Sequence, residues 1–235
     1  MGHNLPLHKY YSKIYRKYDL VNRLFTFGKD NTWRKETVRY CLKQKPEKVL
    51  DVCCGTGDLA IELKLQSNND LYVTGYDFNE NMLSIAKKKA DRSWLSIEFI
   101  QGDVAHMNFS DSTFDAITIG FGFRNLTYKN SNSDKHLNEL NRVVKSGGHI
   151  YILETSKPAN SIISFAFNIY LKLFLIPVGG IVSGSWTAYR YLAKSTSEFF
   201  NPEEIKKMLL KSGFKVLFSK KYFFGAANLV IAEKV

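Results

Sequence analysis

The sequence predicts an α/β fold with a mostly parallel sheet of seven strands, helices on both faces and an antiparallel pair of strands at one edge. Two observations support this prediction. Short apolar segments rich in β-branched residues alternate with helix-compatible segments through residues 49–154, which is typical of parallel strands joined by helices. The last two strand-like segments have no helix between them, so we expect them to pair antiparallel. A chain of 235 residues that is 45% hydrophobic suits one α/β domain with additions.

The first strand ends in a glycine turn around which the rest of the chain is organised. Four apolar or acidic positions, 49–52, run into Gly55-Thr56-Gly57, and a helix-compatible segment follows from Asp58. Glycine permits backbone angles closed to other residues and leaves no side chain between the main chain and a ligand. We therefore expect a nucleotide-like cofactor at this turn, although a glycine turn without a ligand is the simpler alternative.

Asp51 decides between two cofactors that the spacing allows. The residues from Gly55 to Ala60 also fit the dinucleotide pattern G-x-G-x-x-A, and Asp77 follows about 20 residues later, so NAD is one reading. A carboxylate at Asp51, at the end of the strand, would repel a pyrophosphate and would attract the ammonium group of a methionine moiety. We therefore favour S-adenosylmethionine, bound by Asp51, Gly55, Thr56 and Gly57.

Acidic residues also follow the next two strands. Asp77 ends the strand expected over 71–77, where a carboxylate can accept both ribose hydroxyls, and Met82 would pack on the adenine face. Asp103 follows the strand expected over 96–101, where a carboxylate or backbone group can read the adenine amino edge. Each acid alone could be a helix cap, but together they would surround one crevice.

The remaining elements follow from periodicity, caps and turns. We expect two helices within residues 8–45, and a capped helix from Asn79. Further expected elements are strands at 114–120 and 149–154, helices at 134–145, 161–182 and 201–212, and final strands at 214–222 and 226–233. These define an N-terminal helical lid (1–45), a cofactor-binding core (46–157), an apolar helical insertion forming the substrate pocket (158–200), and a C-terminal helix and strand pair (201–235) that complete the same domain.

Composition excludes several classes of protein. Three cysteines, Cys41, Cys53 and Cys54, form neither a disulfide framework nor a zinc motif, and no metal site is expected. The N-terminus lacks the apolar core of a signal peptide, so we expect a cytoplasmic protein. The longest apolar run, Ile162–Val178, is interrupted by Asn168, Lys172 and Pro177, which predicts a poor membrane-spanning helix.

The net charge of +11 is uneven along the chain. Residues 9–48 carry twelve Lys/Arg against four acids, residues 49–201 carry fourteen against fifteen, and residues 202–235 carry seven against three. The basic flanks suggest a face that meets anionic lipid, as a peripheral membrane contact, or nucleic acid. A solvated basic surface without a partner is the alternative.

The residues together resemble the UbiE/MenG family of menaquinone and ubiquinone biosynthesis C-methyltransferases, within the class I S-adenosylmethionine-dependent methyltransferases. The glycine turn alone would indicate any methyltransferase. Two segments narrow the resemblance to quinone methylation: Phe121-Gly122-Phe123-Arg124-Asn125 and Glu154-Thr155-Ser156-Lys157-Pro158. Other matching segments are 18–22, 27–28, 33–34, 50–58, 77–83, 142–148 and 189–192.

This resemblance implies a Rossmann-like fold and a set of site residues. It puts Thr56, Asp77, Asp103 with Val104, and Gly120 on the cofactor. Family members often carry serine at the position of Gly120, so a hydroxyl contact is absent here. The resemblance also implies that Tyr18, Arg124 and Asn125 face the substrate ring.

The reaction implied is C-methylation of a prenylated hydroquinone, demethylmenaquinol. Arg124 would stabilise a phenolate, while Tyr18 and Asn125 would orient the hydroxyl groups. His8 and His106 are conceivable bases but lack a visible partner. A polyprenyl benzoquinol substrate is the alternative, because residues 225–230 depart from the family pattern at the substrate end. A nucleic-acid methyltransferase is disfavoured, since the segment after the fourth strand lacks an Asn-Pro-Pro-Tyr-like motif. A homodimer is compatible with the sequence.

Overall fold

A single seven-stranded sheet forms the centre of the protein, in the order β3-β2-β1-β4-β5-β7-β6. The structure is a computed structural model that describes residues 5–67 and 71–235, with side chains from Tyr10 onward. The strands are β1 (Lys48–Val52), β2 (Tyr72–Asp77), β3 (Glu98–Gln101), β4 (Phe114–Gly120), β5 (Val144–Thr155), β6 (Phe214–Tyr222) and β7 (Ala227–Lys234).

The pairing confirms the predicted mixed sheet. Strands β1 to β5 are mutually parallel, whereas β7 lies antiparallel to both β5 and β6. Strand order reverses at β1, which pairs with β2 on one side and with β4 on the other. In open α/β sheets such a reversal opens a crevice at the carboxyl ends of the strands, because the connections leave in opposite directions. The fold therefore places a crevice beyond Val52 and Gly120.

Helices cover both faces of the sheet, as predicted. One face packs on α3 (Lys29–Leu42), α4 (Asp58–Gln66) and α5 (Glu80–Arg92) through side chains such as Val38, Leu63 and Ala86. The other face packs on α7 (Ser133–Val143) and α11 (Pro202–Lys211). Because both faces are buried, the inner positions of the parallel strands are mostly apolar, which is why the sequence shows apolar runs rather than alternation.

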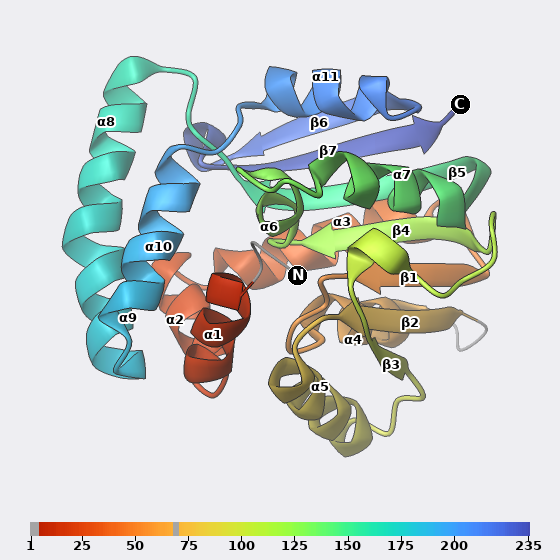
Figure 1. Cartoon of the computed structure of the whole chain (residues 1–235), viewed down its shortest axis with the longest axis horizontal. Helices are drawn as coiled ribbons and strands as arrows, with labels where there is room; N and C mark the ends of the chain where they lie inside the picture. The colour runs from red at the N-terminus through yellow and green to blue at the C-terminus, as the bar shows by residue number, and fades with distance from the viewer. Residues whose placement is uncertain (1–4, 68–70) are drawn as a thin grey trace.

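A separate layer of helices stands beyond the carboxyl ends of the parallel strands (Figure 1). It contains α1 (Leu5–Ile14), α2 (Tyr18–Phe25), α8 (Ser161–Tyr170), α9 (Ile176–Ser183) and α10 (Trp186–Ser197). These helices share a core of their own, in which Ile14 and Val21 meet Leu171, Leu175 and Tyr189. The two segments expected to form a lid and an insertion are thus packed against each other, with the site beneath them.

The N-terminal segment contains three helices among its described residues, not the two that the sequence predicted. The first helical run stops after Ile14, because the amide of Lys17 bonds to the carbonyl of Ile14 and ends the regular ladder. The chain then restarts as α2. Ile14 and Val21, on either side of this break, are both buried in the helical layer.

The apolar insertion contains the helix that the sequence analysis expected over 161–182. Residues Ser161–Ser183 form one continuous helical run, and by length and composition it is the one helix in the described chain that qualifies as a membrane span. Asn168, Lys172 and Pro177 do not interrupt it. A π-helical turn, η2 (Leu171–Leu175), precedes Pro177, and this wider turn accommodates the missing amide donor and the bulk of the proline ring. Only 22% of its apolar window is buried.

Asn79 provides a test of how local capping supports the site. Its side chain accepts hydrogen bonds from the amides of Asn81 and Met82 at the start of α5. We expect Asn79→Ala to lower the free energy of unfolding by about 1 kcal/mol, the usual cost of losing an N-cap. Urea unfolding without cofactor measures the change, and Asn81→Ala, at an exposed position of the same turn, is the control. Equal unfolding midpoints for the two variants would contradict the capping role.

Candidate active site

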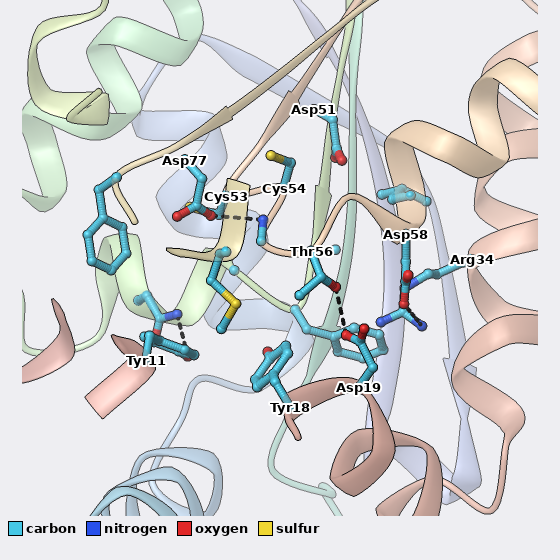
Figure 2. A pocket seen from close by; sticks show the side chains of 18 residues that line it. Tyr11, Tyr18, Asp19, Arg34, Asp51, Cys53, Cys54, Thr56, Asp58 and Asp77 are labelled. Atoms are coloured by element: carbon cyan, nitrogen blue, oxygen red, sulfur yellow. Dashed lines mark hydrogen bonds and ion pairs between the residues drawn. The ribbon is translucent and has the colours of Figure 1, made fainter. Parts of the chain in front are cut away.

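A crevice lies beyond the carboxyl ends of β1, β2 and β4. Eight residues selected from the sequence line it: Tyr18, Asp51, Gly55, Thr56, Asp77, Met82, Gly120 and Asn125. Figure 2 shows Asp51 and Asp77 on neighbouring strands, with Tyr18 and Asp19 approaching from the lid.

Asp51 is a buried carboxylate with one unpartnered oxygen. The residue is 0% exposed; Oδ1 accepts a hydrogen bond of 2.9 Å from the hydroxyl of Thr118, while Oδ2 has no partner. Burial raises the pKa of Asp51 to about 7. A buried carboxylate oxygen without a partner costs free energy unless a ligand supplies a donor or a positive charge. The ammonium group of S-adenosylmethionine has this chemistry, so the site fits the cofactor that the sequence predicted.

Asp77 joins the glycine turn to the next strand. Its two carboxylate oxygens accept the amides of Gly55 and Asn79, each at 2.9 Å. Burial raises its pKa to about 6, against these hydrogen bonds, which lower it. Each oxygen keeps a further lone pair for a ligand hydroxyl, as the ribose role requires. Asp77 therefore fixes the turn and remains available to the cofactor.

Close packing explains why two turns at the crevice contain glycine. Gly57 has φ +81°, and a Cβ there would lie 2.8 Å from the Cβ of Ala86. A Cβ at Gly122, in the turn after β4, would lie 2.3 Å from the Cβ of Cys53 in the turn after β1. The two turns therefore pack directly against each other. Met82 is buried beside them and lines the crevice.

A polar network ties the lid to the glycine turn. The hydroxyl of Thr56 donates to Asp19 of α2 at 2.6 Å, and Lys89 of α5 lies 2.6 Å from both Asp19 and Asp58. Thr56 was predicted to contact the cofactor, and in this structure its hydroxyl is bonded to the lid. Sequence reasoning missed Asp19, Asp58 and Lys89, because partners 31–70 residues apart carry no local signal.

Arg34 places a second cation at the same end of the crevice. It forms an ion pair with Asp30 and lies 3.9 Å from Asp58. Its guanidinium stands 5.2 Å from the centre of the Phe121 ring, a cation–π distance. The sequence analysis assigned no role to Arg34, which it named only as part of the matching segment 33–34. Its burial, on α3 and beside the crevice, is a result of the tertiary fold.

Asp103 and Val104 lie away from this crevice lining. The Asp103 side chain, 52% exposed, caps the short helix η1 (Val104–His106) by accepting the amide of Ala105. Val104 is buried in the core cluster. Their assignment to the adenine thus stays a prediction. His106 ends the same short helix, and the side chain of His8 lies outside the described residues.

A smaller cavity continues from the crevice and contains Arg124. Tyr18 and Phe121 line both spaces. Arg124 is buried; its Nη1 donates to the hydroxyls of Thr155 at 2.9 Å and Thr196 at 2.8 Å. Its Nε is buried without a partner. An unpartnered charged donor in a cavity is suited to an oxygen atom of a ligand.

Glu154 holds Arg124 in place. One carboxylate oxygen lies 3.7 Å from Nη1 of Arg124, and the other accepts the backbone amide of Arg124 at 3.0 Å. Burial alone would lower the pKa of Arg124, but the Glu154 carboxylate raises it above its ordinary value. The guanidinium therefore stays charged. The two segments that carry the family resemblance, 121–125 and 154–158, are therefore in contact through Arg124 and Glu154.

Two tyrosines complete the wall between the crevice and the small cavity. The amide nitrogen of Asn125 donates to the hydroxyl of Tyr11 at 2.9 Å, and the Tyr11 and Tyr18 rings meet edge to face with centroids 5.7 Å apart. Burial raises the pKa of Tyr18 to about 12, so its hydroxyl remains a donor at neutral pH. The predicted residues Tyr18, Arg124 and Asn125 are thus brought together, and Tyr11 joins them.

A third, apolar cavity of about 240 Å³ adjoins the small one. The two share Phe25, Thr26 and Thr155. The rest of its lining is aromatic or aliphatic. It comes from the turn after α2, from α3, from α8 and from the start of β7 with the residues before it: Phe27, Trp33, Ile163, Ala166, Phe167, Tyr170, Phe223, Phe224, Ala226 and Ala227. A polar crevice, a cationic cavity and an apolar cavity therefore follow one another. Within residues 5–67 and 71–235, no cluster of potential metal ligands occurs.

The fold is shared with solved S-adenosylmethionine-dependent methyltransferases. A solved S-adenosylmethionine-dependent methyltransferase from Clostridium acetobutylicum superposes with a TM-score of 0.65 at 14% identity, covering 93% of this chain and 97% of that one. Another, from Aquifex aeolicus, gives 0.60 at 22% identity, covering 84% and 89%. These likenesses concern the fold, and they confirm the predicted Rossmann-like architecture.

Sequence comparison narrows the class to a family. A sequence profile of the ubiE/COQ5 methyltransferase family matches residues 3–234, and the chain belongs to this family. It is 38% identical to a demethylmenaquinone methyltransferase of Thermus thermophilus over 224 residues, covering 95% of this chain and 99% of that protein. It is 40% identical to one of Thermotoga maritima over 226 residues, covering 96% and 94%.

Asp51 makes cofactor binding dependent on pH. Only the ionised carboxylate attracts an ammonium group, and its pKa is about 7 in the free protein. Lowering the pH from 8 to 6 protonates Asp51, so we expect the dissociation constant of S-adenosylmethionine to rise about tenfold by calorimetry.

Two variants sharpen this measurement. Asp51→Asn should bind weakly at both pH values and lose the pH dependence. Asp111→Asn, at a side chain that is 77% exposed, should keep both the affinity and the pH dependence of the wild type. An Asp51→Asn variant with wild-type pH dependence would exclude Asp51 as the titrating group.

Proposed function

We propose that this enzyme methylates a ring carbon of a prenylated hydroquinone, and that the substrate is demethylmenaquinol. The observation that carries the proposal is the position of Arg124 between two unlike spaces. On one side lies the crevice with the unpartnered Asp51 oxygen, and on the other lies a cavity lined mainly by aromatic and aliphatic side chains. A quinol has a ring with polar oxygens at one end and an apolar tail at the other, so its groups match the order of these spaces. The names of the relatives in Thermus thermophilus and Thermotoga maritima support this substrate.

The chemistry asked of the protein is charge stabilisation and alignment. When bound, S-adenosylmethionine supplies an electrophilic methyl group, and the ring supplies electron density best as its phenolate. Arg124 keeps its own proton and offers a fixed charge to the phenolate oxygen. Tyr18 and Asn125 orient the ring oxygens, which holds the reacting carbon in line with the methyl donor.

The apolar cavity would receive the first part of the prenyl tail. Its walls come from Phe25 and Phe27 of the lid and from Phe167 and Tyr170 of the insertion, with Tyr170 anchored to the Phe25 carbonyl by a 2.6 Å hydrogen bond. These are the two segments that the sequence analysis assigned to the lid and to the substrate pocket. A space of about 240 Å³ holds only a few methyl-branched carbons, so the tail must leave the protein.

The location of the enzyme follows from this substrate. We place the protein at the cytoplasmic surface of the membrane, as a peripheral enzyme, because a prenyl tail is dissolved in the bilayer. Nucleic acid is a poorer candidate, since the apolar cavity next to Arg124 offers few groups that bind phosphate. A benzoquinol is the second candidate, because Ala226 and Ala227, which line the apolar cavity, belong to the segment 225–230 where the sequence departs from its family pattern.

A direct assay separates these candidates. The purified protein is incubated with methyl-labelled S-adenosylmethionine and either demethylmenaquinol or the demethylated polyprenyl benzoquinol, each reduced. We expect label on a ring carbon of the naphthoquinol, with at least about tenfold lower kcat/KM for the benzoquinol. Transfer to a phenolic oxygen, or to neither quinol, would refute the proposal.

Arg124 should act mainly on the transition state. Arg124→Lys keeps the positive charge but loses the planar guanidinium. The variant therefore lacks both the Nη1 atom that bonds Thr155 and Thr196 and the Nε donor that faces the cavity. We expect kcat to fall by about 10²-fold, the scale for one missing oxyanion donor. The dissociation constant of S-adenosylmethionine, measured by calorimetry, should change less than about twofold. Arg92→Lys, at an exposed position on α5, is the control. Wild-type turnover in Arg124→Lys would remove Arg124 from the mechanism.

A further inference from the structure

The helical run Ser161–Ser183 has a large apolar face that nothing in the described chain covers. Ile162, Phe165, Ile169 and Leu173 recur at helical spacing along this face. They are strongly exposed, with Phe165 at 67% and Leu173 at 74%. An apolar stripe of this length on a surface helix marks an interaction site. We call these four residues, together with Phe223 and Phe224, the docking face.

The same helix lines the apolar cavity with its other residues. Ile163, Ala166 and Phe167 face the cavity, so the docking face and the cavity wall are two sides of one helix. Phe223 and Phe224 belong to both surfaces: they line the cavity, and yet they are 48% and 81% exposed. Figure 1 shows the turn between β6 and β7 beside the segment that leads into α8. The docking face therefore borders the mouth of the cavity.

Backbone geometry holds the two phenylalanines in place. Phe223 and Phe224 have φ of 48° and 54°, in the left-handed region that bulky side chains avoid. Strained residues of this kind persist where the surrounding structure imposes them, and they concentrate at functional sites. Here the neighbouring residues Tyr222 and Gly225 are buried, so the chain must present both rings at the surface.

The charged residues in the segment that carries the helical part of the docking face have one sign. Residues 156–197 contain no Asp or Glu, although residues 49–201 as a whole are nearly neutral. Four cations in this segment are exposed: Lys157, Lys172, Arg190 and Lys194. Lys172 stands next to Leu173 in the helix, so an inserted apolar face would bring this cation to the level of the lipid headgroups. An acid-free apolar helix with flanking cations is the pattern of an interfacial helix on an anionic membrane.

The packing of the helical run Ser161–Ser183 indicates whether this run lies on the membrane or crosses it. Leu171 and Leu175 are buried in the core of the helical layer with Tyr189. A crossing helix would have to leave this core, whereas a helix lying in the plane of the interface keeps it and inserts only its outer face. The arrangement of buried and exposed residues therefore favours the second geometry.

We propose that the docking face inserts into the headgroup region of an anionic bilayer and sets the mouth of the apolar cavity against the lipid. This inference rests on the proposed function for the meaning of the cavity, but the surface itself is defined by exposure and charge. The prenyl tail would then pass from the bilayer into the cavity without crossing water. The basic flanks at residues 9–48 and 202–235 would then contribute less to membrane binding than the acid-free segment 156–197.

The test is co-sedimentation of the full chain with vesicles of phosphatidylglycerol and phosphatidylcholine, or of phosphatidylcholine alone. We expect the wild type to pellet with anionic vesicles at low salt and to be released at high salt. The double variant Phe165→Ser/Leu173→Ser should partition at least about tenfold less. Trp94→Ser is the matched control, because Trp94 is 95% exposed and lies on the loop between α5 and β3, at the other edge of the sheet.

Activity assays separate this proposal from the proposed function. With a short-chain, water-soluble quinol, the double variant should keep wild-type turnover, because Phe165 and Leu173 do not line the cavity. With a long-chain quinol in vesicles it should lose most of its rate. Unchanged pelleting of the double variant would overturn the docking face even if the enzyme methylates quinols. Normal vesicle binding without methylation of any quinol would refute the function and leave the docking face standing.

Sedimentation velocity examines the other possible occupant, a second copy of the chain. We expect the double variant and the wild type to sediment alike. If the wild type is a dimer that the double variant disrupts, and neither binds anionic vesicles, the face is an interface between copies and the bilayer proposal is wrong.

Discussion

The buried carboxylate of Asp51 is the constraint on which the site depends. A parallel sheet brings the ends of its strands to one edge, and the reversal of strand order at β1 leaves that edge open next to Asp51. One oxygen accepts a hydrogen bond from Thr118 and the other is unpartnered. The folded protein therefore carries an unfavourable desolvation free energy at Asp51, which a cationic ligand would offset. The glycine turn, with Gly57 pressed against Ala86, allows the chain to pass close to that ligand.

The helical layer converts this cofactor crevice into a selective site. Asp19 bonds to Thr56 and Lys89, which holds α2 over the glycine turn, and Tyr11 bonds to Asn125 on the other side. Between these contacts lies Arg124, fixed by Glu154 from β5. The lid and the insertion thus contribute the walls that the common fold lacks. In this account the sheet and its helices bind the methyl donor, and the lid and the insertion determine which methyl acceptor fits.

Much of the core could be predicted from local sequence. Apolar strands, helix caps and glycine turns are local signals, so the strand at 114–120 and the crevice residues Asp51, Asp77 and Met82 were found where expected. The prediction of a methyltransferase is confirmed by the family to which the chain belongs. The strand boundaries were less accurate: β5 begins at Val144, although the sequence analysis expected a helix through residue 145 and the strand only from residue 149.

Other features have no local signal. Thr56, Asp19 and Lys89 are distant in the chain, and only the packing of α2 and α5 brings them together. No glycine or proline stands at the break after Ile14, so this break has no local signal. The π-helical turn before Pro177 was not predicted, because such a turn depends on context. The acid-free segment 156–197 was hidden by averaging charge over a longer range, and counting by element would have found it.

The path from the Asp51 crevice through the Arg124 cavity to the apolar cavity is the central claim. A crystal structure with S-adenosylhomocysteine and a prenylated naphthoquinol tests it most directly. The account predicts the amino group of the cofactor product at Asp51, a ring oxygen within hydrogen-bond distance of Arg124, and the tail passing Thr155 into the cavity beside Phe167. A ring bound outside the Arg124 cavity, or a tail leaving by another route, would contradict it.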